Sequence, residues 1–321
     1  MSAVTEVRTS PQDAMKALES LAIAHPTAKE AFETGKKLLA PGPGRRIVLF
    51  SGPPGFGKSW LASKLHDACV AACGELVSKY PNAQPSRRIE ASEAGGGGFS
   101  WEEVYDEIIG DQLVRPRNGS KLALPWEPIA VDSQRQGNRV SRKKAAAVKK
   151  LKFDHTRQLL MDEVAHLLGD GSPKAIATSA RALKSFSNKA VTKVALFSCY
   201  DGLDLMTMDT QLARRIQLVE LRPYDSECSE DMRVFKSVVL TIGKALGLDE
   251  GELLVRSEQL MERTNGAVGA LVDTFFSALT MGESGKPFNY KLLDRYMPSK
   301  DWAKRVHMEI IEGRKRMEDL L

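Results

Sequence analysis

The sequence has no long hydrophobic run and little cysteine. No apolar stretch approaches the roughly 18–20 residues that a membrane-spanning helix requires, which excludes a transmembrane protein. The first residues hold no basic segment followed by an apolar one, so a secretory signal is not expected. None of the 4 cysteines lies in a CxxC pair or near a cluster of histidines, which argues against a zinc site. We therefore expect a cytoplasmic protein whose cysteines stay reduced.

The composition is that of a globular protein. Hydrophobic residues make up 42% of the 321 residues and charged residues 27%. This balance can bury a core and argues against wholesale disorder. The length accommodates one large domain or two modest ones.

The net charge of +5 is unevenly distributed. Residues 111–160 contain twelve Lys or Arg and four Asp or Glu, a balance of +8, so the rest of the chain sums to −3. The stretch 134–152 has no acidic residue and eight basic ones: Arg135, Arg139, Arg142, Lys143, Lys144, Lys149, Lys150 and Lys152. A solvated helix face usually alternates charges. The acid-free stretch therefore favours a polyanionic partner such as nucleic acid, with a plain solvated face as the alternative.

Hydrophobic patterning changes along the chain. Short apolar strands alternate with helical stretches up to about residue 221, and helical patterns alone follow. This order predicts a parallel α/β domain followed by a helical lid. The expected parts are an N-terminal helical extension (1–44), an α/β core (45–224) with a basic insertion at about 111–152, and a lid with a C-terminal tail (225–321).

The individual elements follow from the same patterns. The expected strands are 45–50, 87–92, 157–163, 193–200 and 215–221. Helices are expected at 60–79, through the basic stretch, and at 173–187, 229–246, 250–263, 267–281 and 299–320. Ser100 and Glu103 have the spacing of a capping box at the start of a further helix.

Residues 52–59 carry the pattern G-x-x-x-x-G-K-[ST], between an apolar strand and a helical stretch. Glycines permit tight turns, and backbone N–H groups at a helix N-terminus then converge on a phosphate. Lys58 would contact the β- and γ-phosphates, and the Ser59 hydroxyl would bind Mg²⁺. The alternative is a glycine turn before a helix. The predicted ATP-binding residues are Gly52, Pro53, Pro54, Gly55, Phe56, Gly57, Lys58, Ser59 and Trp60.

A second acidic motif follows about a hundred residues later. The apolar segment 159–161 ends in Asp162 and Glu163. In nucleotide-binding domains of this kind the first acid holds Mg²⁺, and the second orients or deprotonates the attacking water. Many strands end in two acids, so the pair gains weight only together with the phosphate loop.

Together these segments resemble an AAA+ ATPase, and more narrowly the AAA+ transposition regulators of the TnsC/TniB type, which are related in role to the Mu B protein. The resemblance spans about residues 20–280. It is carried by GPPGFGKSWLA, LLMDEVAHLL and LFSCYDGLDLMTMDTQLARRIQLVELRPYD. The elements Asp-Glu-x-x-His-Leu and Gln-Leu-x-Arg-Arg point to this branch. The implied fold is an AAA+ P-loop NTPase core, a parallel sheet flanked by helices, with short N-terminal helices and a C-terminal helical lid.

The resemblance implies an activity and partners. Such proteins bind ATP with Mg²⁺, assemble on duplex DNA as rings or helical filaments, and link a target-selection protein, in some cases part of an RNA-guided complex, to a transposase. ATP hydrolysis would drive disassembly. It would be slow, because the lid segment NGAVGALVDTFF has no arginine at the usual second-sensor position. On DNA the protein would associate with the bacterial nucleoid.

The resemblance also assigns residues. Arg214 or Arg215 corresponds to the arginine finger that reaches a neighbouring subunit's nucleotide, and Ser198, or alternatively Cys199, to the first sensor. Basic residues of the insertion would follow a DNA backbone without reading its sequence: Arg115, Arg117, Lys121, Arg135, Arg139, Arg142, Lys143, Lys144, Lys149 and Lys150. Trp101, Tyr105 and Trp126 are expected in the core or at an interface.

Two other functions fit the same motifs. One is a helicase-loader or clamp-loader-like ATPase of DNA replication, which would differ in its partners. The other is a scaffold that binds nucleotide as a switch without hydrolysing it, which would differ in phosphate release.

Overall fold

The computed structural model describes residues 16, 18, 25–42, 44–91, 93–94, 98–110, 136–169, 171–208, 210–282 and 288–320. Contacts divide the chain into two compact units. We call them the lid unit (Met1–Glu30, Gly52–Gly57 and Leu221–Lys315) and the sheet unit (Ala31–Ser51, Lys58–Glu220 and Arg316–Leu321). Within the described ranges, no helix is both long and apolar enough to cross a membrane.

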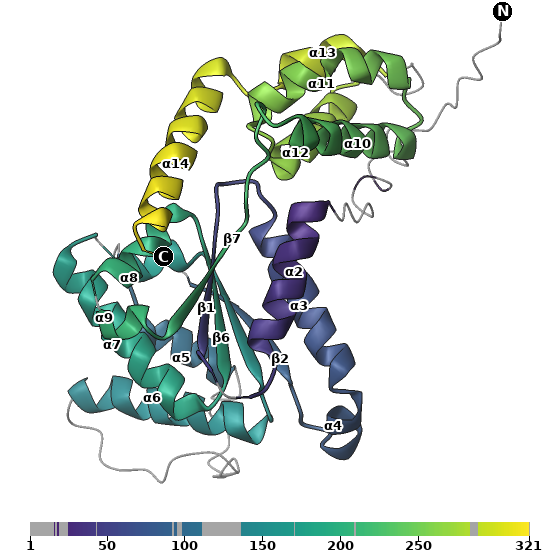
Figure 1. Ribbon diagram of the computed structural model, residues 1–321. Helices are drawn as coiled ribbons and strands as arrows, with labels where there is room; N and C mark the ends of the chain where they lie inside the picture. Colours follow the sequence, from purple (N-terminus) through teal and green to yellow (C-terminus); the bar gives the residue numbers. More distant parts are fainter. Residues whose placement is uncertain are drawn as a thin grey trace, which may run out of the picture. The chain divides into compact units, whose positions relative to one another are not determined.

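A five-stranded parallel sheet forms the centre of the sheet unit (Figure 1). Its spatial order is β2 (Ser86–Glu90), β5 (Gln158–Asp162), β6 (Lys193–Ser198), β1 (Ile47–Ser51) and β7 (Ile216–Glu220). Every residue of β1 and β6 is buried, which explains their continuous apolar sequences. Because the strands are parallel and in register, Ser51 lies opposite Ser198 and Glu220 at the carboxyl edge of the sheet.

Helices cover both faces of this sheet (Figure 1). One side carries α3 (Lys58–Ala72), which is followed by α4 (Gly74–Lys79), and the carboxyl part of α2 (Pro26–Leu39). The other side carries α5 (Trp101–Ile109), α6 (Gln136–Phe153) and α7 (Pro173–Ala190). The shorter elements are β3 (Glu93–Ala94), β4 (Gly98–Phe99), the 3-10 turns η2 (Val164–Leu168) and η3 (Tyr200–Leu203), α8 (Asp204–Thr207) and α9 (Thr210–Ala213).

Aromatic side chains fill both sides of the sheet. Phe50 of β1 stacks on Phe197 of β6 with ring centroids 4.9 Å apart. Between α5 and α7, Tyr105 lies 5.7 Å from Phe186, and Trp101 packs against both rings. Tyr105 is therefore a core residue, one of the two expected places, and Trp101 is half-buried against it, whereas Trp126 lies outside the described residues.

The lid unit is helical. It contains α10 (Ser229–Ala245), α11 (Glu250–Thr264), α12 (Val268–Thr280), α13 (Tyr290–Tyr296) and most of α14 (Lys300–Glu318). Its core includes Phe235, Leu253 and Phe275, all fully buried. The Arg222 guanidinium donates two hydrogen bonds, of 2.6 and 2.8 Å, to the buried Asp231 carboxylate, and these lower the pKa of Asp231. This ion pair fixes the start of α10 to the chain that leaves the sheet.

Most expected elements are present, with local differences. All five strands form, but the helix expected over 60–79 breaks at Cys73 because Gly74 starts a separate short helix. Ser100 is the N-cap of α5, yet its side chain makes no capping hydrogen bond, so the expected capping box is wrong. The pattern did not predict α13, where the Asn289 side chain accepts a hydrogen bond from the Lys291 N–H.

Candidate functional site

The predicted phosphate loop, Gly52–Gly57, runs directly from the end of β1 into α3. Gly55 and Gly57 adopt φ angles of +79° and +78°, a region that other residues rarely enter. A Cβ on Gly52 would lie 2.8 Å from the carbonyl oxygen of Leu221, so only glycine fits there. Pro53 and Phe56 are buried, whereas Pro54 is exposed. The glycines are thus required by backbone geometry.

The loop contacts the start of α12 within the lid unit. The Gly269 N–H donates a 2.9 Å hydrogen bond to the Gly55 carbonyl oxygen, and Ala267 and Ala270 lie beside Gly55. The lid residues at this contact are small and uncharged. This agrees with the lack of a second-sensor arginine in the sequence.

Gly269→Ala tests this contact. The new Cβ would lie 2.5 Å from the Gly55 carbonyl oxygen, so the loop must shift. Overpacking of this kind costs about 1–3 kcal/mol, and we expect nucleotide affinity to fall roughly tenfold in titrations with a fluorescent ATP analogue. Gly74→Ala is the matched control, because a Cβ there meets nothing within 4 Å. Equal affinities for both variants would contradict the role of the contact.

Helix α3 begins at Lys58, the lysine of the motif. The Lys58 ammonium donates a hydrogen bond to the Cys199 sulfur, 3.3 Å away. Ser59 is exposed and Trp60 half-buried. Lys58 and Ser59 therefore lie in the first turn of a helix, where N–H groups and the helix dipole favour an anion.

The acidic pair lies at the carboxyl end of β5. Asp162 is half-buried and accepts a 3.1 Å hydrogen bond from the Glu163 N–H. Glu163 is exposed and has left-handed backbone angles, φ 52° and ψ 41°, which a non-glycine residue adopts only at a cost. The chain thus turns sharply between the two acids and gives them different surroundings, as different roles would require.

The end of β6 places the candidate sensor residues. The Ser198 hydroxyl is buried and donates a 2.9 Å hydrogen bond to Asp201, which also accepts one from the Gly202 N–H. Ser198 therefore holds the turn after β6, whereas Cys199 is the residue that contacts Lys58. Of the two alternatives, Cys199 is the one that contacts the lysine of the motif.

Arg214 and Arg215 lie between α9 and β7, and both are exposed. The Arg215 guanidinium donates a 2.6 Å hydrogen bond to the Asn188 side chain. Arg214 makes no side-chain hydrogen bond or ion pair with any residue that the structure describes. Both precede the amino end of β7, while the phosphate loop follows the carboxyl end of β1. Ile216 lies opposite Ile47, and β1 continues for four more residues to Ser51. The start of β7, next to the two arginines, is therefore about 13 Å from the carboxyl end of β1.

The predicted DNA-binding residues are not equivalent. Arg115, Arg117, Lys121 and Arg135 lie outside the described residues. Arg139 and Lys143 form ion pairs with Glu102 on α5, and Lys150 is buried against Asp154. Lys144 and Lys149 instead face a pocket on the other side of α6. Arg142 is half-buried, with interactions of its own.

No group of three or more His, Cys, Asp or Glu in the described ranges could hold a metal by itself. Mg²⁺ does not need such a cage, because it keeps waters and takes one or two protein ligands plus substrate phosphates. The exposed Ser59 hydroxyl and the half-buried Asp162 carboxylate are oxygen donors of that kind.

Four residues of functional interest were not in the predicted set. Gly269 contacts the phosphate loop, and Lys152, Ser185 and Lys189 line the pocket beside α6. The available signal for the last two was that α7, like α6, contains no acidic residue.

Residues 130–226 match the family model described as "Bacterial TniB protein". The resemblance to proteins of the TniB type is therefore confirmed over that segment. No curated protein matches the chain at a significant level.

Two solved structures are similar over most of the chain. A Walker-type ATPase of Pyrococcus abyssi has 18% identity and a TM-score of 0.50, and the match covers 90% of this chain and 75% of that one. The ORC2 protein of Aeropyrum pernix, in ADPNP-ADP complexes, has 14% identity and a TM-score of 0.51, with coverages of 89% and 68%. At such identities the likeness shows the fold alone, which is the predicted parallel sheet flanked by helices.

Proposed function

We propose, from the match to the TniB family model and the geometry of the sheet edge, that this chain is an ATP-dependent regulator of transposition. It assembles on target duplex DNA, connects a target-selection protein with the transposase, and hydrolyses ATP to disassemble. The observation that carries the ATPase part is the convergence of Lys58 and Cys199 at the carboxyl edge of a parallel sheet, where β5 also ends in Asp162 and Glu163.

Each residue has a role in this proposal. The loop amides and Lys58 bind the phosphates, and Ser59 and Asp162 provide oxygen atoms for Mg²⁺. Glu163 accepts a proton from the attacking water. The left-handed backbone at Glu163 turns the chain between the two acids, so that Asp162 would hold the metal while Glu163 stays available as the base.

The position of Arg214 supports assembly. An arginine about a strand's length from the carboxyl edge cannot serve the nucleotide of its own chain, but its exposed guanidinium can reach that of another copy. Charge stabilisation by such an arginine couples assembly to the bound nucleotide. Arg215, held by Asn188, positions this segment.

Electron microscopy of the protein with duplex DNA tests the assembly. We expect rings or filaments on DNA with a non-hydrolysable ATP analogue and their loss after ATP turnover. Arg214→Ala should prevent assembly, and Lys174→Ala, which changes an exposed lysine on α7, should not. Single particles without DNA under every nucleotide condition would contradict the proposal.

A non-hydrolysing, nucleotide-switched scaffold is the second candidate. The observation that favours it is the lid contact at Gly55, where the nearest described lid residues, Ala267, Gly269 and Ala270, are uncharged. Phosphate release separates the two functions. A helicase-loader or clamp-loader-like role is distinguished by the partners that the protein captures, a replicative helicase or a transposase.

A further inference from the structure

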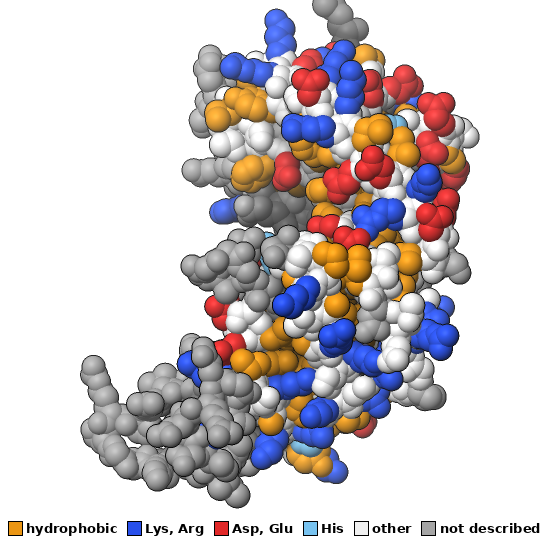
Figure 2. Space-filling model, turned by 90° about the vertical axis from the view of Figure 1, so that its left-hand side faces the viewer, with side chains coloured by type: hydrophobic (Ala, Val, Ile, Leu, Met, Phe, Trp, Pro, Cys, Tyr) orange, Lys and Arg blue, Asp and Glu red, His pale blue; other side chains and the backbone are white. Residues whose placement is uncertain are grey.

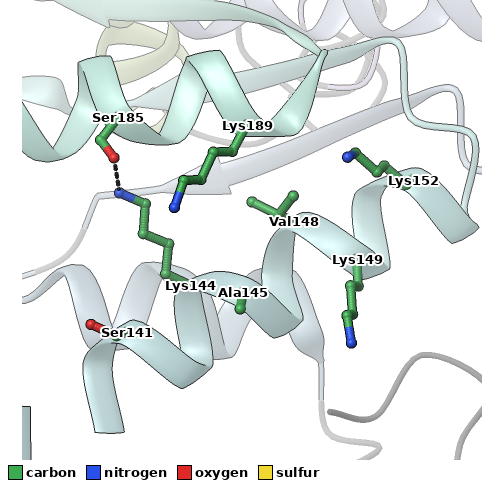
Figure 3. Close-up of a pocket in the computed structure, with 8 residues that line it drawn as sticks. All are labelled: Ser141, Lys144, Ala145, Val148, Lys149, Lys152, Ser185 and Lys189. Carbon is green, nitrogen blue, oxygen red and sulfur yellow. Dashed lines mark hydrogen bonds between the residues drawn. The ribbon is translucent and has the colours of Figure 1, made fainter. Parts of the chain in front are cut away.

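A pocket lies between α6 and α7 in the sheet unit. Its volume is about 600 Å³, and its polar lining consists of Ser141, Lys144, Lys149, Lys152, Ser185 and Lys189. In Figure 3, Lys144 and Lys189 extend into the space between the two helices, Lys152 stands further along α6, and Lys149 points away from α7. Four lysines therefore line the pocket, and three of them, Lys144, Lys152 and Lys189, are on the side of α6 that faces α7 or at its end.

The two helices that line the pocket, α6 and α7, contain neither Asp nor Glu. The acids of α5, Glu102 and Asp106, pair with Arg139 and Lys143 on another side of α6. Among the residues that the structure describes, no carboxylate forms an ion pair with Lys144, Lys149, Lys152 or Lys189. Figure 2 shows the side of the molecule that is on the left in Figure 1. On its lower part, where α6 and α7 lie in Figure 1, Lys and Arg side chains gather with few carboxylates among them.

The Lys144 ammonium is disfavoured by its surroundings in the pocket. The Lys144 ammonium is half-buried and donates a 2.7 Å hydrogen bond to the Ser185 hydroxyl. Burial lowers the pKa of Lys144, and the charge of Lys189 lowers it further. A bound anion would offset both effects, whereas an empty pocket leaves two lysines repelling one another.

The pocket is separate from the nucleotide edge. Lys152 lies near the end of α6, before β5 begins at Gln158, and Lys189 near the end of α7, before β6 begins at Lys193. Both therefore lie at the amino edge of the sheet, while Lys58 and Asp162 lie at the carboxyl edge. Along α6, Lys144 and Lys152 are eight residues apart, about 12 Å, which is longer than a single phosphate group.

We propose that the α6–α7 pocket binds successive phosphates of a duplex DNA backbone through Lys144, Lys152 and Lys189. This inference rests on the proposed function and locates its DNA contact. Compared with the DNA-binding residues expected from the sequence, it leaves out Lys143 and Lys150, which form ion pairs with Asp106 and Asp154. It adds Lys152 and Lys189. Such contacts hold any sequence equally, because phosphates carry no base identity.

The test is the double variant Lys144→Ala/Lys189→Ala, compared with Lys174→Ala at the opposite end of α7. Binding to several unrelated duplexes is measured by fluorescence anisotropy, with an ATP analogue and between 0.05 and 0.2 M salt, concentrations at which each phosphate contact adds about 0.9 to the salt slope. For two lost contacts we expect the slope to fall by about 1.8. At 0.1 M salt we expect a loss of about eightfold per contact for every duplex.

Acetylation of lysines in the wild-type protein, read by mass spectrometry, gives a second measurement that does not depend on the variant folding. Duplex DNA should protect Lys144, Lys152 and Lys189, and leave Lys174 reactive. Inorganic tripolyphosphate serves as a small-anion probe. Protection by tripolyphosphate but not by DNA would overturn the assignment to DNA.

The outcomes separate this inference from the proposed function. If the wild type binds DNA but the double variant binds equally well and no pocket lysine is protected, the pocket inference fails while the proposed function stands. If the wild type binds no duplex under any nucleotide condition, the proposed function fails and the pocket assignment with it.

Discussion

Lys58→Ala is expected to abolish nucleotide binding, and with it any nucleotide-dependent assembly on DNA. Lys58 lies in the first turn of α3, directly after the loop whose glycines adopt positive φ angles. A charge-assisted hydrogen bond to a phosphate contributes about 1.5–3 kcal/mol, and two such bonds correspond to at least a hundredfold in affinity. Titration with a fluorescent ATP analogue measures this loss.

The control for this prediction is Lys64→Ala. Lys64 lies on the same helix and loses the same group, but it is outside the phosphate loop, so its affinity for nucleotide should stay unchanged. The DNA-bound assemblies of the Lys58 variant are then counted by electron microscopy. Normal assembly without nucleotide binding would mean that the loop does not control association.

Glu163→Gln is expected to stop turnover while preserving nucleotide binding. The amide has nearly the shape of the carboxylate and fits the same left-handed backbone, but it cannot accept the proton of the attacking water. Loss of a general base lowers the rate by about 10²–10⁴-fold. Phosphate release, measured under saturating ATP with and without DNA, reports this change.

The same variant should form assemblies that persist in ATP, because disassembly depends on hydrolysis. Glu220→Gln is a suitable control, since Glu220 also ends a strand at the carboxyl edge but accepts a hydrogen bond from the Tyr200 hydroxyl within the fold. Background-level release from the parent protein and from Glu163→Gln alike would favour the non-hydrolysing scaffold.

The centre of the sheet could be predicted because its inner strands, β5, β6 and β1, are buried almost throughout. Runs such as IVLF in β1 and VALF in β6 are continuous in the sequence for that reason, and each is followed by a serine. Short elements were harder to predict. The two-residue strands β3 and β4 have too few residues to show an alternating pattern, and the break at Cys73 lies within a run of small and apolar residues.

The role of a site residue could be predicted where its motif lies in one segment. It could not be predicted where contacts with residues distant in the sequence determine the role. Lys58 and Ser59 follow from local spacing. The difference between Arg214 and Arg215 depends on Asn188, a residue from another helix. In the same way, Glu102 and Asp106 of α5 decide that Lys143 faces into the fold, while Lys144, its neighbour in sequence, faces a pocket.

The contact between Cys199 and Lys58 offers a site for chemical labelling beside the lysine of the phosphate loop motif. Cys73 is buried, and burial raises the pKa of the Cys69 thiol to about 12, which keeps it protonated and unreactive. Cys228 is exposed, but serine can replace it. The remaining thiol, that of the half-buried Cys199, lies 3.3 Å from the Lys58 ammonium. A small fluorophore attached there would report, in real time, when the phosphate-binding lysine changes partner.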